Sequence, residues 1–276
     1  MTDVVQPLEP KSLKEQFIEQ FEQLILSGKF KCGQKLPPER ELARMLAVSR
    51  PIVHEGLVEL AAKGLVSIIP RRGTVVNDFR TDGSVELLHS LLQYGQGELQ
   101  PDILDGMLDM RLLFETEIAR KAAKNFSAED MGRLEAAYAE EQRLYAADAS
   151  RGIEIAEADF RFHHTLSMAS GNMVYPLLMN SFRSVYLNIL LRFYRHNIDF
   201  KPILENHHRI LEALKRRDGD TAASEMGHLL RKSAEKLNQL LASERAGAES
   251  AGTEGAGLER LGASSETGNG ADDAHS

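Results

Sequence analysis

One carboxylate and several histidines in the C-terminal half of the sequence could bind a metal ion. Asp159 and His163 lie four residues apart in EADFRFHHTL, so on a helix their side chains share one face, about one turn apart. His207 and His208 fall on a later predicted helix, and His228 on the next. An Asp with three His suits zinc, nickel or manganese and leaves coordination positions for a ligand or water. Because an Asp four residues before a His is common by chance, ordinary packing or surface residues are the alternative interpretation.

A second group of candidate residues is basic and lies between 33 and 77. Arg50 is expected at the start of a helix that follows Ser49, where an arginine inserted into the major groove can bond to guanine O6 and N7. Arg40, at the start of the preceding helix, is placed for a phosphate or a neighbouring base. The string Arg71-Arg72-Gly73 forms a small positive tip suited to a minor groove. Each arginine alone could be a solvated surface charge, but their joint position at helix starts and a hairpin tip indicates DNA binding.

The local patterns around these arginines predict a winged helix-turn-helix. Apolar residues at spacings of three and four predict a helix over 12–27, capped by Ser12 and ended by Gly28. Two short helices are expected at 38–46 and 50–63, with Ser49 as the N-cap of the second. Alternating residues at 65–69 and 74–76 predict a hairpin, and Lys35-Leu36 can add one rung to it.

The metal-ligand candidates belong to a region without strand signals. From 101 to about 241 the apolar periodicity predicts an antiparallel bundle of six or more helices. The fold class is therefore mainly α, an N-terminal winged helix-turn-helix with a small β wing plus an all-α bundle. The expected divisions are a flexible arm at 1–10, the DNA-binding domain at 11–77, a linker with a short helix at 78–100, the bundle at 101–242 and a disordered acidic tail at 243–276. The predicted bundle helices are one long helix through residues 104–119 and five more at about 127–147, 152–169, 174–196, 200–216 and 221–241.

Charge and composition restrict the class of protein. The net charge is −8, but residues 1–80 carry 12 Lys and Arg against 10 Asp and Glu, so the basic surface lies in the N-terminal domain. The one cysteine fits a reducing cytoplasm. The N-terminus has no signal-peptide pattern and the chain has no bilayer-spanning apolar run, so a cytoplasmic protein without membrane association is expected.

The segment LPPERELARMLAVSR, followed by GLV and then RRGTVV, resembles the winged-helix domain of the GntR superfamily of bacterial transcription regulators. This resemblance implies that Arg40 and Arg50 contact base or backbone and that Gly73 lies at the wing tip. The family usually has arginine in place of His54, and Thr or Ser in place of Pro51. The shorter, partly charged His54 and the lost hydroxyl at Pro51 predict an altered operator preference.

The strings DFRFH, ASGN and HHRILEAL, with a histidine some twenty residues later, resemble the FCD-type helical domain of the FadR subfamily. The resemblance implies that Asp159, His163, His207 and His228 hold a divalent metal ion, zinc with nickel or manganese as alternatives. His208 is the alternative to His207, and the spacing to His228 is one residue shorter than the family pattern. Arg111 resembles the arginine that binds the carboxylate of a small effector in this family.

These resemblances imply a homodimeric repressor that releases its double-stranded operator when an organic acid binds at the metal site. The strings VNDF and ASGNMVYPLLMNSFRSVY also resemble regulators of fatty-acid metabolism that bind acyl-CoA without a metal. A metal sensor and a metal-dependent enzyme are further alternatives. No HExxH-type pair accompanies the ligands and an enzyme has no use for the basic domain, so the prediction is a regulator and not an enzyme.

Overall fold

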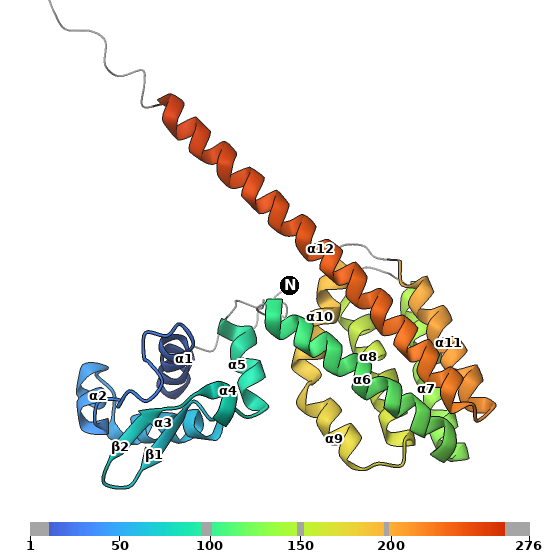
Figure 1. Cartoon of the computed structure of the whole chain (residues 1–276), viewed down its shortest axis with the longest axis horizontal. Coiled ribbons are helices and arrows are strands. Elements are labelled where there is room, and N and C mark those ends of the chain that lie inside the picture. Colours follow the sequence, from blue (N-terminus) through green and yellow to red (C-terminus); the bar gives the residue numbers. More distant parts are fainter. Residues whose placement is uncertain (1–10, 95–100, 148–151, 196–198, 263–276) are drawn as a thin grey trace, which may run out of the picture.

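The computed structural model describes residues 11–94, 101–147, 152–195 and 199–262, and its elements form an N-terminal domain and a larger helical bundle (Figure 1). The N-terminal elements are α1 (Leu13–Leu26), α2 (Glu39–Met45), α3 (Arg50–Ala62), β1 (Val66–Ile69), β2 (Gly73–Val76), α4 (Phe79–Asp82) and α5 (Glu86–Tyr94). The bundle comprises α6 (Pro101–Asn125), α7 (Ala128–Ala147), α8 (Gly152–Ala169), α9 (Val174–Ser181), α10 (Arg183–Arg195), α11 (Lys201–Lys215) and α12 (Gly219–Gly262). The predicted fold class is confirmed.

The N-terminal domain forms because three amphipathic helices and the hairpin share one apolar core. Ser12 and Glu15 form the capping box that begins α1. Phe17 and Phe21 are buried and their rings stack at 4.4 Å between centroids. They pack in the same core as Leu57 of α3, which holds the predicted recognition helix against α1.

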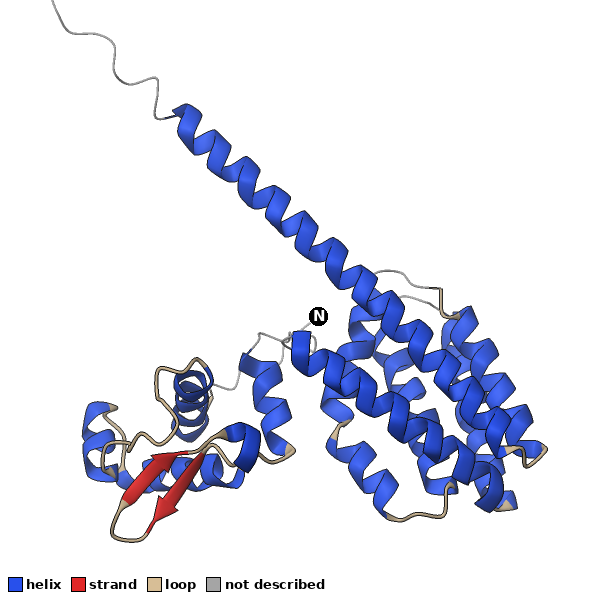
Figure 2. Ribbon diagram, viewed as in Figure 1, coloured by secondary structure: helices blue, strands red, loops and turns tan. Residues whose placement is uncertain are grey.

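The only sheet within the described residues is the two-stranded wing (Figure 2). Strand β1 pairs antiparallel with β2 in the register Val66 to Val76 and Ile69 to Gly73. Lys35 adds the predicted single rung opposite Val75. Gly73, at φ 94°, adopts a backbone conformation that glycine tolerates best, so the chain can turn tightly at the wing tip.

The bundle buries one large core, in which α8 is the most enclosed element. On α8 the apolar residues Phe160, Phe162 and Leu166 are buried alongside the polar Asp159 and His163. Helices α6, α7, α9 and α10 pack against α8, while α12 lies along α6 and α11. The polar groups of α8 are therefore removed from bulk water on several sides, so each needs a partner inside the protein.

Two predictions from the sequence differ from the structure. The single helix expected at 174–196 is two helices, α9 and α10, separated at Phe182, whose side chain packs against the main core. A disordered tail was expected from 243, but α12 continues as a helix to Gly262 and projects away from the bundle (Figure 1). Alanine, glutamate, arginine and leucine in this stretch favour helix, and extending an existing helix avoids the cost of nucleation. Residues 263–276 of the expected tail and the arm at 1–10 lie outside the described residues.

None of the described helices combines the length and hydropathy needed to cross a membrane.

Candidate functional site

Three of the predicted metal ligands meet in the core of the bundle. Asp159 and His163 come from α8 and His207 comes from α11, and one ligand atom of each lies within 4.8 Å of the others. Their exposed fractions are 3%, 3% and 0%. Helical spacing explains the first two, since residues four apart share a face. His207 joins them because the apolar pattern of α11 turns the same helix face toward α8.

Two buried glutamates orient the histidine rings. Nδ1 of His163 lies against the carboxylate of Glu115 on α6, and Nδ1 of His207 lies 2.8 Å from Glu141 Oε2 on α7. With each Nδ1 directed at a carboxylate, each Nε2 is directed at the point between the two rings. Glutamate–histidine pairs of this kind fix ring orientation and ligand basicity in metal sites.

The distance between the imidazoles fits a shared cation. Nε2 of His163 lies 3.3 Å from Nε2 of His207. Two imidazole nitrogens bound to one ion at about 2.1 Å lie roughly 3.0 to 3.4 Å apart for octahedral to tetrahedral angles. If both Nδ1 protons face the glutamates, the two Nε2 lone pairs face each other, and a cation between them removes the repulsion. Asp159 Oδ1, 4.0 Å from His207 Nε2, supplies a third donor on the same side. The residues present therefore fit a divalent ion.

Burial and neighbouring charges separate the pKa values of these groups. Burial raises the pKa of Glu115, but the charges of Arg111 and His163 outweigh it and hold that pKa at about 2. Burial lowers the pKa of His163, but Glu115 and Asp159 raise it above its usual value. Burial lowers the pKa of His207 to about 3, so His207 is neutral at physiological pH. Burial and the charge of Asp159 raise the pKa of Glu141 well above its usual range. The neutral form of His207 is the form in which an imidazole binds a metal ion.

The predicted fourth ligand, His228, does not join the other three. It is exposed on α12, while its neighbours Leu229 and Leu230 are buried and line the cavity beside the site. One residue along a helix is a rotation of about 100°, so the leucines can face the site only if His228 faces away. The choice between the adjacent histidines of α11 is also clear, since His208 is exposed and stacks on Tyr138 at 6.0 Å.

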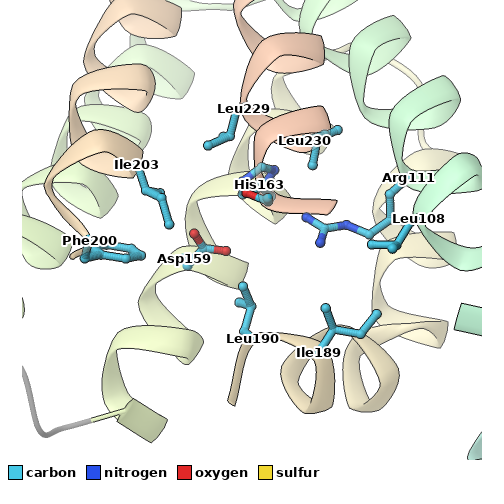
Figure 3. A pocket seen from close by; sticks show the side chains of 11 residues that line it. Leu108, Arg111, Asp159, His163, Ile189, Leu190, Phe200, Ile203, Leu229 and Leu230 are labelled. Atoms are coloured by element: carbon cyan, nitrogen blue, oxygen red, sulfur yellow. The ribbon is translucent and has the colours of Figure 1, made fainter. Parts of the chain in front are cut away.

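A narrow cavity opens beside the donors and contains the predicted effector-binding arginine (Figure 3). Its volume is about 30 Å³, which is room for about two water molecules. Arg111 is 7% exposed, and its guanidinium points into the cavity toward Asp159 and His163. Its Nε donates to Glu115 at 2.7 Å, and its guanidinium lies 4.0 Å from the centre of the Tyr186 ring. The remaining walls are mostly apolar: Leu108, Ile189, Leu190, Phe200, Ile203, Leu229 and Leu230.

The predicted DNA-binding residues form a second candidate surface, on the N-terminal domain. All eight are exposed: Arg40, Ser49, Arg50, Pro51, His54, Arg71, Arg72 and Gly73. Ser49 occupies the N-cap of α3 as predicted, although its side chain makes no capping hydrogen bond. Glu39 on α2 contacts two of them, with His54 Nδ1 at 2.8 Å and an Arg50 nitrogen at 3.5 Å. The hydrogen bond with His54 lowers the pKa of Glu39. Glu39 therefore fixes the positions of two exposed side chains of α3.

Comparison with known proteins decides the family. Residues 13–76 match the gntR family of bacterial regulatory proteins, and residues 106–232 match the FCD domain. The HTH-type transcriptional regulator Mce2R of Mycobacterium tuberculosis is 33% identical over 189 residues, which are 66% of this chain and 73% of Mce2R. The chain belongs to the GntR family. It is a GntR transcription regulator with an FCD domain, and neither its family nor its relatives are enzymes.

Other relatives of this GntR regulator are named for different roles. The Glc operon transcriptional activator of Escherichia coli K12 is 31% identical over 218 residues, covering 76% of this chain and 82% of the activator. The fatty acid metabolism regulator protein of Shewanella denitrificans is 29% identical over 205 residues, covering 74% and 80%. Among solved structures, Lar, which controls the Listeria monocytogenes agr system, shares the fold with a TM-score of 0.55 at 19% identity, covering 84% of this chain and all of Lar.

Three side chains of the GntR regulator's site were not predicted from the sequence. Glu115 and Glu141 face the histidines, and Tyr186 donates to Asp159 Oδ2 at 2.9 Å. The sequence does carry a signal for the two glutamates, because each lies on the helix face that is otherwise buried. Glu115 follows Arg111 by four residues on α6, and Glu141 follows Ala137 by four residues on α7. A charged residue at such a position needs a buried partner. No comparable signal marks Tyr186, since tyrosine is common on a half-buried helix face.

Proposed function

We propose that this GntR regulator is a homodimeric repressor whose operator affinity is set by a small organic acid bound beside a divalent metal ion. The observation that carries the proposal is the buried convergence of Asp159, His163 and His207, with Arg111 directed into the adjoining cavity. Asp159, His163 and His207 would hold the ion, and zinc, nickel or manganese suits this donor set. When bound, the ion supplies Lewis-acid affinity for a carboxylate oxygen. Arg111 would take the other carboxylate oxygen, and the apolar walls would exclude water from both contacts.

The DNA-binding half of the proposal rests on the exposed arginines of α2, α3 and the wing. In a homodimer, two copies of α3 would enter successive major grooves of a palindromic operator. Effector binding would shift the population of dimers toward a spacing that no longer fits both half-sites.

An acyl-CoA effector is the second candidate, because a fatty acid metabolism regulator is among the relatives. The cavity of about 30 Å³ favours a small acid, since pockets for larger ligands measure about 300 to 1,000 Å³.

Operator binding by an Arg50→Ala variant tests the DNA assignment. We expect a gel shift with operator DNA to weaken about 5- to 150-fold, from the loss of about 1–3 kcal/mol for one bidentate base contact. Arg133→Ala, an exposed arginine of α7, is the matched control and should leave operator affinity unchanged. Unchanged binding by Arg50→Ala would show that α3 is not the recognition helix.

Elemental analysis of protein purified without chelator tests the metal site. Wild-type protein should carry about one divalent ion per chain, and the Asp159→Asn, His163→Ala double variant should lose it. Thermal-shift screening with organic acids and with acyl-CoAs, each with and without chelator, separates the two effector candidates. Stabilisation by acyl-CoA that is insensitive to chelator would refute the metal-dependent proposal.

A further inference from the structure

His54 lies one turn after Arg50 on α3, on the side of that helix that faces α2. Residues four apart share a helix face, and both side chains contact Glu39 of α2. The side chain of Arg50 is 64% exposed and that of His54 is 57% exposed. Because residues near the start of a recognition helix meet base edges in the major groove, the His54 ring is presented to the same groove as Arg50.

The contact with Glu39 determines which nitrogen of the His54 ring carries the proton. Nδ1 of His54 lies 2.8 Å from Oε1 of Glu39, and an Arg50 nitrogen lies 3.5 Å from the other carboxylate oxygen, Oε2. The hydrogen bond with His54 and the contact with Arg50 lower the pKa of Glu39, so this carboxylate is ionised at neutral pH. An ionised carboxylate can only accept hydrogen bonds, so Nδ1 of His54 must be the donor.

The second ring nitrogen, Nε2, is then without a proton when the imidazole is neutral. It is directed away from Glu39, because the two ring nitrogens face in different directions, and no hydrogen bond to it is present among the described residues. A bare nitrogen accepts a hydrogen bond and repels other acceptors. In the major groove the amino groups of cytosine and adenine donate, whereas guanine presents the acceptors N7 and O6 and thymine presents O4. The bare Nε2 of His54 therefore matches cytosine or adenine.

We propose that Glu39 fixes His54 as a hydrogen-bond acceptor, so that this position of α3 selects cytosine, with adenine second, where an arginine would select guanine. Cytosine ranks above adenine because adenine carries the acceptor N7 beside its amino group. Glu39 is a positioning residue here, since it acts on the base through the His54 ring. This inference rests on the proposed DNA-binding function and adds to it a base preference at one operator position.

Selection from a randomised DNA library by the full-length protein tests the inference. The library is double-stranded with a random segment of about two helical turns, and selection is made at about pH 8, where a free imidazole is neutral. His54→Ala identifies the operator position that His54 reads, as the position at which the variant loses the wild-type preference. There we expect wild-type protein to favour cytosine over guanine about 2- to 10-fold, which is the effect of one hydrogen bond.

A modified base shows which member of the selected pair His54 contacts. In the selected duplex, 7-deazaguanine replaces the guanine that pairs with the selected cytosine, so that the acceptor N7 is removed while the cytosine amino group stays. If Nε2 of His54 accepts from cytosine, the affinity of wild-type protein for the two duplexes should agree within about twofold. A larger loss of affinity would mean that His54 donates to guanine.

Glu39→Gln tests the positioning role of the carboxylate. An amide both donates and accepts, so either nitrogen of the His54 ring can carry the proton, and the preference for cytosine over guanine should fall below about twofold. Glu41→Gln removes the same charge from an exposed position of the same helix and should keep the wild-type preference. Nitrogen NMR of the imidazole, at the same pH and without DNA, should show Nε2 of His54 bare in wild-type protein and partly protonated in Glu39→Gln.

The outcomes distinguish this inference from the proposed function. A protonated Nε2 in wild-type protein, a loss of affinity for the 7-deazaguanine duplex, or an unchanged preference in Glu39→Gln would overturn the inference and leave the proposed DNA binding standing. The same holds if His54→Ala changes the preference at no position. If wild-type protein enriches no sequence from the library, the proposed function is overturned, and this inference with it.

Discussion

The linker helix α5 is fixed to the DNA-binding domain by a buried hydrogen bond, which the loss of one side-chain oxygen atom would remove. Ser90 Oγ donates to Glu22 Oε1 on α1 at 2.7 Å, and Lys63 Nζ at the end of α3 donates to the same oxygen at 2.6 Å. Ser90 is 1% exposed and Glu22 is 3% exposed. The contact therefore joins three helices in a largely buried region.

Ser90→Ala should loosen α5 without unfolding the domain. The variant loses one hydrogen bond to a charged acceptor, worth about 1.5–3 kcal/mol, while Glu22 keeps its ion pair with Lys63. At 1.4 kcal/mol per factor of ten, the ratio of docked to undocked α5 should fall about 10- to 150-fold. The apolar anchor Leu87, which is 4% exposed, is untouched.

Native-state hydrogen exchange of backbone amides measures this ratio segment by segment. Amides of α5 should exchange about 10- to 150-fold faster in Ser90→Ala, while amides of α3 keep their wild-type rates. Ser27→Ala, an exposed serine at the end of α1, is the control and should change neither segment. Equal α5 protection in Ser90→Ala and wild type would refute the reasoning, because the contact would then carry no net free energy.

Three further predictions concern the recognition helix, the buried histidine and a helix terminus. His54→Arg should add about 1–3 kcal/mol of preference for guanine at one operator position, measured by binding to a randomised half-site, and an unchanged preference would show that Glu39 holds this side chain away from DNA. His207 has a folded pKa of about 3, so its contribution to stability is complete above its unfolded pKa of about 6.5 and is lost as pH falls toward 3, about 2 kcal/mol by pH 5. Urea unfolding with chelator should show this loss in wild type and not in His207→Gln, and identical pH dependence in the two proteins would contradict it. Gly64→Ala should lower the free energy of unfolding of the DNA-binding domain by about 2–4 kcal/mol, because Gly64 has φ 77° and a Cβ there would overlap the backbone of Asp82. The control Gly106→Ala places its Cβ in open space, so its free energy of unfolding should be unchanged or slightly higher.

Local patterns predicted the DNA-binding domain closely because its elements are determined by short-range physics. The cap at Ser12, the N-cap position of Ser49 and the rung at Lys35 all follow from neighbouring residues. The alternation before and after Arg71-Arg72-Gly73 is sufficient to define the hairpin. Such signals do not depend on how distant segments pack.

The bundle was less predictable because its details depend on tertiary contacts. The separation of α9 from α10 at Phe182 follows from that side chain packing in the core, which no local pattern encodes. The sequence alone favoured His207 over His208 as the metal ligand, because the apolar residues of α11 define its buried face and His207 lies on that face. His228 was wrongly expected as a ligand because its place was inferred from family spacing, and a shift of one residue turns a helical side chain by about 100°.

The arrangement of helices gives the site a physical route to the DNA-binding domain. Ile189 and Leu190 of α10 line the cavity, and α10 also packs against α5. Helix α5 in turn contacts α1 and bonds through Ser90 to Glu22, the residue that Lys63 of α3 also reaches. Packed helices shift as units, since their interfaces are close-packed. We therefore expect Ser90→Ala to weaken the effect of effector on operator binding more than operator binding itself, because it loosens α5 and leaves the recognition surface intact.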